Sequence, residues 1–407
     1  MHGGATGCHA RGVRVGEFPA ESRVFRFGIG IALCRNGSRA ASGFGTGHFA
    51  FIAMTASFFR FASALGLFLL VAGCREQQEI TFAAPAQWKE LPEELQKPAA
   101  EELEKYTGSF AAPKLLGHDE VSVEHLKHGQ QVYELRCAQC HGDNGDGNGP
   151  VGAQMYPRPR DYRKGIFKFT STGYGSRPLR SDLVRTLKRG IRGTSMPSFD
   201  LLAADDLEAV VDYVLVLTHR GELSESLFAV ADAEGAIKDD VVTTDAVEPL
   251  IEKWKNAREA VLLPLTPEPE LTVERAMRGR ELFLKNGIGC LKCHGEDGRG
   301  RTKENLAGDL KDKWGNPTRA ADLTSGFLRG GQEPMDIYRR IMGGINGTPM
   351  PAFASAFRDN PDAVWDLVAF VKYITNRRRA GEAPPPGVIK PFVPDVDKGA
   401  AEAGAGG

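Results

Sequence analysis

The sequence lacks a surplus of positive charge, an apolar stretch of membrane-spanning length and a large set of cysteines. Its 51 Lys and Arg residues are balanced by 52 Asp and Glu residues, so nucleic acid is not an expected partner. Residues 64–73 form an apolar run of about ten positions, whereas a spanning helix needs roughly twenty. The 407 residues are 42% hydrophobic and 25% charged, which excludes a wholly disordered, collagen-like or multi-span membrane chain.

The front of the chain has the layout of an export signal. Residues 1–53 show neither a helical nor a strand period, and we expect them to be a mis-assigned upstream extension. Residues 54–73 combine a positive start, the apolar run and small residues, as signal peptides do. The Val-Ala-Gly-Cys ending at Cys74 resembles the lipobox of bacterial lipoproteins, which implies cleavage before Cys74 and lipidation of its thiol. We therefore expect an exported lipoprotein, anchored on the periplasmic side of a membrane; a signal peptide without lipid and a short membrane anchor are the alternatives.

The second half of the chain repeats the motifs of the first half in the same order. Each copy has a glycine and an aromatic residue, a Cys-x-x-Cys-His motif, a glycine-rich acidic loop, a Met-Pro pair and a closing amphipathic segment. The histidine and the methionine are 55 residues apart for His141 and Met196, and 56 apart for His294 and Met350. Because only two copies exist, the pattern indicates tandem duplication of a unit of about 100 residues rather than a solenoid.

The repeat divides the rest of the chain into domains and connecting segments. The prolines of the segment before the first copy predict a tether with one short helix, and the Pro-, Gly- and Ala-rich end predicts a disordered tail. Residues 246–263 have the period of a single amphipathic helix. We expect a leader at 74–120, a first domain at 121–222, a connector at 223–270, a second domain at 271–378 and a tail at 379–407.

The two Cys-x-x-Cys-His motifs predict covalent attachment of haem. Two thiols on one helical turn can bond to the two vinyl groups of one haem, and the next histidine can ligate its iron. A zinc site would need a second pair nearby, but the pairs are 153 residues apart, and a thioredoxin-like pair would follow a strand rather than the helical pattern of residues 132–135. The predicted attachment residues are Cys137, Cys140, Cys290 and Cys293, and the predicted iron ligands are His141 and His294.

Met196 and Met350 are the candidates for the ligand on the opposite face of each iron. The proline after each methionine restricts it to extended backbone geometry and can aim the thioether inward. Histidine and methionine together fill both axial sites and raise the reduction potential, so the expected chemistry is outer-sphere electron transfer. The rival ligands are Met155, Met277, Met335 and Met342, none of which recurs in register in both halves, and His118, His125 and His128 in place of Met196.

At these motifs the sequence resembles the class I cytochromes c. Residues 129–141 are similar to the start of that family, and residues 366–376 are similar to its C-terminal helix. The resemblance implies an all-α fold of two tandem domains with long loops and two covalently bound haem c groups. It also implies that the first and last helices cross at a glycine and two aromatic residues, which are Gly129, Tyr133 and Tyr213 in one copy, and Gly279, Phe283 and Tyr373 or Phe370 in the other.

The resemblance also suggests which backbone group orients the imidazole of the first copy. Pro150, nine residues after His141, is the candidate to supply a carbonyl oxygen to the ring. The second copy departs from this pattern, since no proline follows its histidine before Pro317. It also has three extra residues before its cysteine pair.

The expected function is the transfer of single electrons between redox partners, such as a quinol-oxidising complex, a terminal oxidase or a periplasmic dehydrogenase. The alternatives are a di-haem enzyme that converts peroxide, thiosulfate or nitrite, a haem subunit of a membrane respiratory complex, and a haem-based sensor or scaffold. An enzyme would need one open or weakly ligated iron, and the two equivalent Met-Pro segments argue against that. Basic residues around the first motif are candidates to neutralise haem propionates or dock an acidic partner, with a solvated face as the alternative: Arg158, Arg160, Arg163, Lys164, Lys168, Arg177, Arg180, Arg185, Lys188, Arg189 and Arg192.

Overall fold

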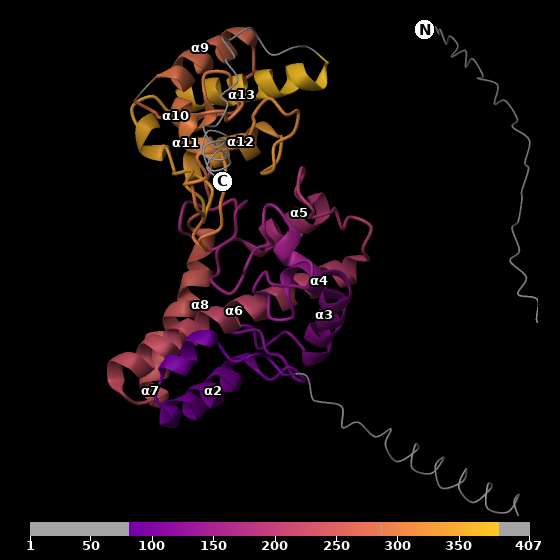
Figure 1. The fold of residues 1–407 in the computed structure, drawn as a ribbon, viewed down its shortest axis with the longest axis vertical. Helices are drawn as coiled ribbons and strands as arrows, with labels where there is room; N and C mark the ends of the chain where they lie inside the picture. Colours follow the sequence, from indigo (N-terminus) through magenta and orange to yellow (C-terminus); the bar gives the residue numbers. More distant parts are fainter. Residues whose placement is uncertain (1–80, 286, 382–407) are drawn as a thin grey trace, which may run out of the picture. The chain divides into compact units, whose positions relative to one another are not determined.

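Helices and loops make up the part of the chain that the structure describes (Figure 1). The computed structural model describes residues 81–285 and 287–381, which belong to one unit of the fold. The predicted extension, the signal peptide, Cys74 and nearly all of the predicted tail lie outside these residues. Within them the structure has isolated β-bridges but no strand, which confirms the all-α prediction. No helix in the described ranges is long and apolar enough to cross a membrane.

The two copies contain corresponding helices in the same order. The first copy has α3 (Val123–Arg136), α4 (Ala138–His141), η2 (Gly152–Gln154), α5 (Arg180–Arg189) and α6 (Ala204–Glu234). The second copy has α9 (Val273–Leu284), α10 (Cys290–His294), α11 (Lys303–Leu306), α12 (Pro334–Gly343), η5 (Ala354–Phe357) and α13 (Ala363–Arg379). The elements outside the copies are η1 (Ala86–Glu90), α2 (Glu93–Thr107), α7 (Asp239–Val241), the π-helix η3 (Val242–Val247), α8 (Glu248–Lys255) and η4 (Asn256–Arg258).

The first helix of each copy begins at the same kind of cap. The Ser122 hydroxyl accepts a hydrogen bond from the His125 amide at the start of α3, and the Thr272 hydroxyl accepts one from the Arg275 amide at the start of α9. Such caps satisfy an amide that has no partner inside the helix. The same local chemistry therefore fixes where both copies start.

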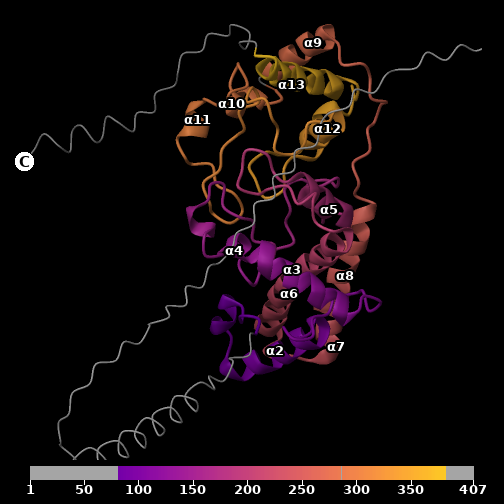
Figure 2. The ribbon, with the colours of Figure 1, turned by 90° about the vertical axis from the view of Figure 1, so that its right-hand side faces the viewer.

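The first and last helices of each copy cross at a glycine, α3 against α6 and α9 against α13 (Figure 2). A Cβ atom on Gly129 would lie 2.0 Å from the Ala209 carbonyl oxygen, so only a glycine lets the two backbones come this close. Beside the crossings, the ring centroids of Tyr133 and Tyr213 are 5.4 Å apart, and those of Phe283 and Phe370 are 5.1 Å apart. The predicted crossing is confirmed, and its second aromatic partner is Phe370 rather than Tyr373.

The leader packs into a core, so the predicted free tether is wrong for its described part. Trp88, in η1, and Leu103, in α2, are buried against Leu223 and Leu227 of α6. The Trp88 indole nitrogen also donates a hydrogen bond of 3.1 Å to the Ser224 carbonyl oxygen. The prolines at 85 and 92 stand immediately before η1 and α2. They precede helices, where a proline removes no helical hydrogen bond, instead of marking an open coil.

Helix α6 continues past the predicted end of the first domain at residue 222. It ends only at Gly235, which has the left-handed conformation (φ 61°) that glycine adopts at helix ends. Residues Leu223, Leu227 and Val230 extend its apolar stripe and pack on η3 and α8. The connector forms one continuous helical run from Asp239 to Arg258 through α7, η3, α8 and η4, so it begins and ends earlier than the predicted helix at 246–263. One helix thus serves both the first domain and the layer formed by the leader and connector.

His219 lies on α6 between these two parts and gives the protein a source of acid sensitivity. The residue is 4% exposed, and its ring packs edge-on against Trp254, with centroids 4.6 Å apart. Burial, with smaller contributions from the nearby His118 and Arg177, lowers the pKa of His219 to about 3. The unfolded chain binds a proton at this histidine more readily than the folded protein does. The unfolding free energy is therefore highest above about pH 6.5, where the ring is neutral in both states, and it decreases as the pH falls toward 3.

We therefore expect the substitution His219→Phe to flatten the acid side of the stability profile. Between pH 6.5 and pH 5 the wild-type protein should lose about 2 kcal/mol more unfolding free energy than the variant, since the buried ring must remain neutral. Denaturant titrations at several pH values measure this difference. Leu223→Ala, a truncation on the same buried helix, is the control. Its effect on the unfolding free energy should be the same at every pH. Parallel profiles for wild type and His219→Phe would contradict the assignment.

Candidate functional site

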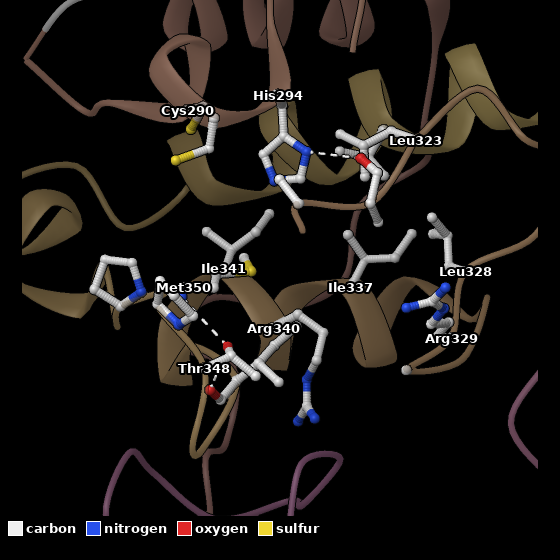
Figure 3. A pocket seen from close by; sticks show the side chains of 18 of the residues that line it. Cys290, His294, Leu323, Leu328, Arg329, Ile337, Arg340, Ile341, Thr348 and Met350 are labelled. Carbon is white, nitrogen blue, oxygen red and sulfur yellow. Dashed lines mark hydrogen bonds between the residues drawn. The ribbon is translucent and has the colours of Figure 1, made fainter. Parts of the chain in front are cut away.

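Each copy contains a cavity lined by the residues that the sequence singled out. In the first copy Cys137, Cys140, His141 and Met196 line a cavity of about 340 Å³. In the second copy a cavity of about 380 Å³ is lined by Cys290, Cys293, His294 and Met350. Figure 3 shows Cys290 and His294 on one side of the second cavity and Thr348 and Met350 on the other. The structure thus brings each predicted set together, and the two cysteine pairs line different cavities.

Short helices place both thiols and the imidazole of each motif on one turn. Cys137 is the residue before α4, and the Cys140 amide donates a hydrogen bond of 3.1 Å to its carbonyl oxygen. Burial raises the pKa of the Cys137 thiol to about 12 and that of the Cys290 thiol to about 11. Redox-active and metal-binding cysteines instead need a lowered pKa. The surroundings of Cys137 and Cys290 therefore disfavour a free thiolate.

A backbone carbonyl orients each imidazole, but it does not belong to Pro150. His141 Nδ1 donates to the Arg160 carbonyl oxygen at 3.1 Å, and His294 Nδ1 donates to the Ala321 carbonyl oxygen at 3.0 Å. Burial lowers the pKa of His141 to about 4 and also lowers the pKa of His294. A neutral ring that donates through Nδ1 leaves the Nε2 lone pair for a metal. The prediction for Pro150 is therefore wrong, because the acceptor lies farther along the chain.

The same loop geometry presents both acceptors despite the different sequences. The His141 carbonyl oxygen accepts from the Gly147 amide at 2.8 Å, and the His294 carbonyl oxygen accepts from the Gly300 amide at 2.8 Å. Gly147 and Gly300 have φ values of 77° and 68°, in the region that favours glycine. The proximal loop of the second copy thus keeps this turn of the first copy without its proline.

A threonine two residues before each methionine fixes the loop that presents it. The Met196 amide donates to Thr194 Oγ1 at 3.2 Å, and the Met350 amide donates to Thr348 Oγ1 at 3.3 Å. Each hydroxyl in turn donates to a carbonyl oxygen, that of Ile191 at 2.7 Å and that of Ile345 at 2.8 Å. The sequence repeats this threonine in both copies, but its role as a brace became visible only in the structure.

The rival ligands have other surroundings. Met342 is buried in the core of the second copy, Met335 packs against that core, and Met277 is 38% exposed. Met155 lines the first cavity together with Met196. The three histidines contact carboxylates instead of lining either cavity: His118 contacts Glu120, His125 contacts Asp212 and His128 contacts Asp206.

Eight of the eleven basic residues around the first motif fall into two groups, and Lys164, Lys188 and Arg192 belong to neither. One group forms ion pairs with carboxylates: Arg163 with Asp161, Arg177 with Glu222, Arg180 with Glu208 and Asp212, Arg185 with Asp182, and Arg189 with Asp336. The other group lines the first cavity and consists of Arg158, Lys168 and Arg160, which also lies 3.9 Å from the Asp312 carboxylate. Arg160 stacks on the Trp314 ring, 3.8 Å from its centroid, and burial lowers its pKa to about 10. Only the second group is placed to meet an anionic ligand in the cavity.

The residues of both cavities fit a covalently attached haem. Each cavity has a cysteine pair and a neutral imidazole on one side, and a thioether in its lining. Isoleucines, leucines and phenylalanines complete the walls, among them Leu183, Phe167 and Phe199 in the first copy and Ile337, Ile341 and Phe353 in the second. Apolar walls with a few convergent polar groups are typical of cofactor sites.

The comparison with protein-family models agrees with this geometry. Residues 126–218 and 276–375 each match the family model of cytochrome c. The chain is also similar to a solved structure, the reducing HAO-like protein complex of Kuenenia stuttgartiensis, at 29% sequence identity and a TM-score of 0.45, over 61% of this chain and 96% of that one. No curated protein matches the chain. The described fold is therefore all-α with two tandem matches to cytochrome c, a family that implies covalent haem c and haem-based electron transfer.

Proposed function

We propose that the protein carries single electrons with two covalently bound haems, each ligated by one histidine and one methionine. Cys137 and Cys140 bond to the first haem and Cys290 and Cys293 to the second. His141 with Met196, and His294 with Met350, are the proposed axial ligands. A bound haem c supplies an iron that alternates between the ferrous and ferric states.

The equal construction of the two cavities is the observation that supports this proposal. On one side of each cavity a carbonyl oxygen fixes the imidazole, and a threonine braces the loop that carries the methionine. With both axial positions filled, neither iron has an open site for a substrate. This favours an electron carrier over a di-haem enzyme.

We further propose that the carrier works outside the cytoplasm, anchored by lipid at Cys74. The signal-like residues 54–73 and the lipobox-like ending at Cys74 support this location. The proposed partners are a quinol-oxidising complex, a terminal oxidase or a periplasmic dehydrogenase. Co-purification from detergent-solubilised membranes distinguishes a free shuttle from a subunit of a respiratory complex.

Redox titrations of Met196→Ala and Met350→Ala, followed by absorption spectra, test the axial ligands. Each variant should lose the far-red thioether–iron band of one haem and keep the band of the other. The potential of the affected haem should fall by on the order of 0.1–0.3 V, within the roughly 0.8 V over which axial ligands tune haem iron.

Met155→Leu and Met342→Leu are the matched controls, one in the first cavity and one in the core of the second copy, and both should keep both bands. If Met155→Leu lost a thioether–iron band, or if both alanine variants kept both bands, the assigned ligands would be wrong. Rapid binding of carbon monoxide to one ferrous haem of the wild-type protein at neutral pH would favour the enzyme instead.

A further inference from the structure

The two cavities share part of their lining. Lys168 and Phe169, from the first copy, line the second cavity as well as the first. Arg329, from the loop before α12 of the second copy, also lines both cavities. We call Lys168, Phe169 and Arg329 the shared wall. Each copy thus contributes a cation to the site of the other.

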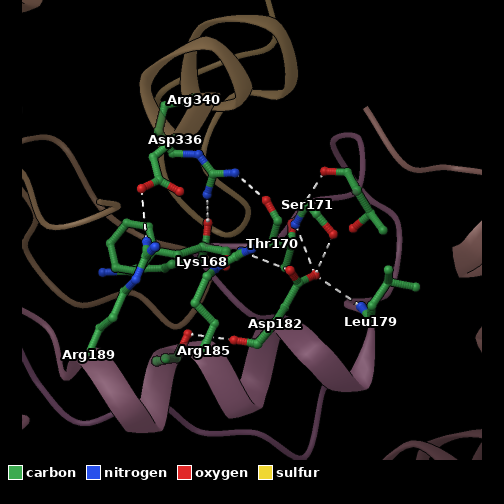
Figure 4. A network of polar contacts seen from close by, with 12 residues as sticks. Lys168, Thr170, Ser171, Leu179, Asp182, Arg185, Arg189, Asp336 and Arg340 are labelled. Atoms are coloured by element: carbon green, nitrogen blue, oxygen red, sulfur yellow. Dashed lines mark hydrogen bonds and ion pairs between the residues drawn. The ribbon is translucent and has the colours of Figure 1, made fainter. Parts of the chain in front are cut away.

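Polar contacts between the copies fix the position of the shared wall (Figure 4). Arg340 of α12 donates to the Lys168 carbonyl oxygen at 3.2 Å and also to the Thr170 carbonyl oxygen. Arg189 of α5 donates to Asp336 at 2.9 Å. Because the Lys168 and Thr170 carbonyl oxygens of the first copy accept hydrogen bonds from the second copy, this segment is held in a fixed position.

A second set of contacts holds the same boundary from the other side. Arg160 of the first copy lies 3.9 Å from the Asp312 carboxylate and stacks on Trp314 of the second copy. The Gly175 amide donates to Asn346 Oδ1 at 2.8 Å. These bonds join the segments on both sides of the shared wall to the second copy.

Within the described part of the chain, the two cations of the shared wall have no ion-pair partner, unlike Arg185 and Arg189 of α5. Arg185 and Arg189 each pair with a carboxylate. Among residues 81–285 and 287–381, neither the Lys168 ammonium nor the Arg329 guanidinium forms an ion pair. Burial, with nearby Arg160 and Arg329, lowers the pKa of Lys168 to about 8 against the opposing effect of the Asp312 carboxylate, so most of the ammonium groups are charged at pH 7. Two cationic residues therefore line both cavities with no carboxylate of the described ranges at ion-pair distance.

We propose that Lys168 and Arg329 set the reduction potentials of both haem sites together. This rests on the proposed function, because it requires a haem in each cavity. A positive charge near a haem disfavours the ferric state, which carries one more positive charge than the ferrous state, and so raises the potential. Partial burial strengthens the effect, since fewer water molecules screen the charge. A cation that lines both cavities acts on both sites, whereas a cation that lines one cavity acts on one.

Redox titration of Arg329→Gln tests the proposal, and Arg158→Gln and Arg319→Gln are the matched controls. Arg158 lines only the first cavity, and Arg319 lines only the second. Arg329→Gln should change the equilibrium constant for one-electron reduction about tenfold at each site. Both midpoint potentials should therefore fall by about 59 mV. Arg158→Gln should lower only the potential of the first site, and Arg319→Gln only that of the second. The Met196→Ala and Met350→Ala spectra assign each midpoint to its site.

Lys168→Gln and Arg329→Lys complete the test. Lys168→Gln removes the cation of the first copy and should also lower both potentials, which provides a second measurement if Arg329→Gln does not fold. Arg329→Lys retains the charge and should restore both potentials. A shift of one midpoint only, or equal shifts in the two controls, would overturn the proposal. Failure of the proposed function is distinguishable, because the wild-type protein would then lack two haems or their thioether bands.

Discussion

Gly279→Ala is expected to destabilise the second copy by about 3 kcal/mol or more, at the upper end of the cost of overpacking a core. The new Cβ atom would lie 1.8 Å from the Asp366 carbonyl oxygen and 2.9 Å from the Phe370 Cβ atom, so α9 and α13 would have to move apart. Both close contacts are with backbone or with the base of a side chain, and neither can rotate away. The equivalent change in the first copy, Gly129→Ala, should act in the same way on α3 and α6.

Denaturant unfolding, followed by far-UV circular dichroism and by the haem absorption of each site, measures the effect. Gly287→Ala is the matched control, because a Cβ atom there would meet nothing within 4 Å and its stability should change little. If Gly279→Ala unfolded at the same denaturant concentration as Gly287→Ala, the close crossing of α9 and α13 would be refuted.

Glu222→Ala should lower the unfolding free energy by about 3–5 kcal/mol, since it leaves a buried guanidinium without its carboxylate. Glu222 of α6 pairs with Arg177, and their side chains are 6% and 8% exposed. The Trp254 indole nitrogen also donates to the Glu222 carboxylate at 2.8 Å. One carboxylate therefore joins a loop of the first copy, α6 and α8.

Two further variants distinguish the loss of the buried ion pair from the general effect of shortening a side chain. Glu208→Ala breaks an exposed pair with Arg180 on the same helix and should cost at most about 1 kcal/mol. The double variant Arg177→Met, Glu222→Leu replaces both charges with apolar groups and should lose less stability than Glu222→Ala. Chemical denaturation measures all three. A loss below 1 kcal/mol for Glu222→Ala would mean that water reaches the pair.

The leader shows how far local patterns can mislead about packing. Its prolines favoured an open tether, yet Trp88 and Leu103 are buried against the second half of α6. The leader sequence does not indicate what it packs against, because its partner is an apolar stripe more than a hundred residues away in the chain. Burial of that stripe is what carries α6 beyond the predicted domain boundary.

The sequence by itself determined the two haem motifs, the duplication and the all-α fold. These signals are local: one helical turn presents two thiols and an imidazole, and apolar residues repeat at helical spacing. Only the tertiary structure identified Arg160 and Ala321 as the groups that orient the imidazoles, since any residue type offers the same carbonyl oxygen. Likewise, only the packing of one copy on the other brings Lys168 and Arg329 to both cavities. Contacts between residues far apart in the chain depend on how the helices pack, and a linear pattern of residue types does not encode that arrangement.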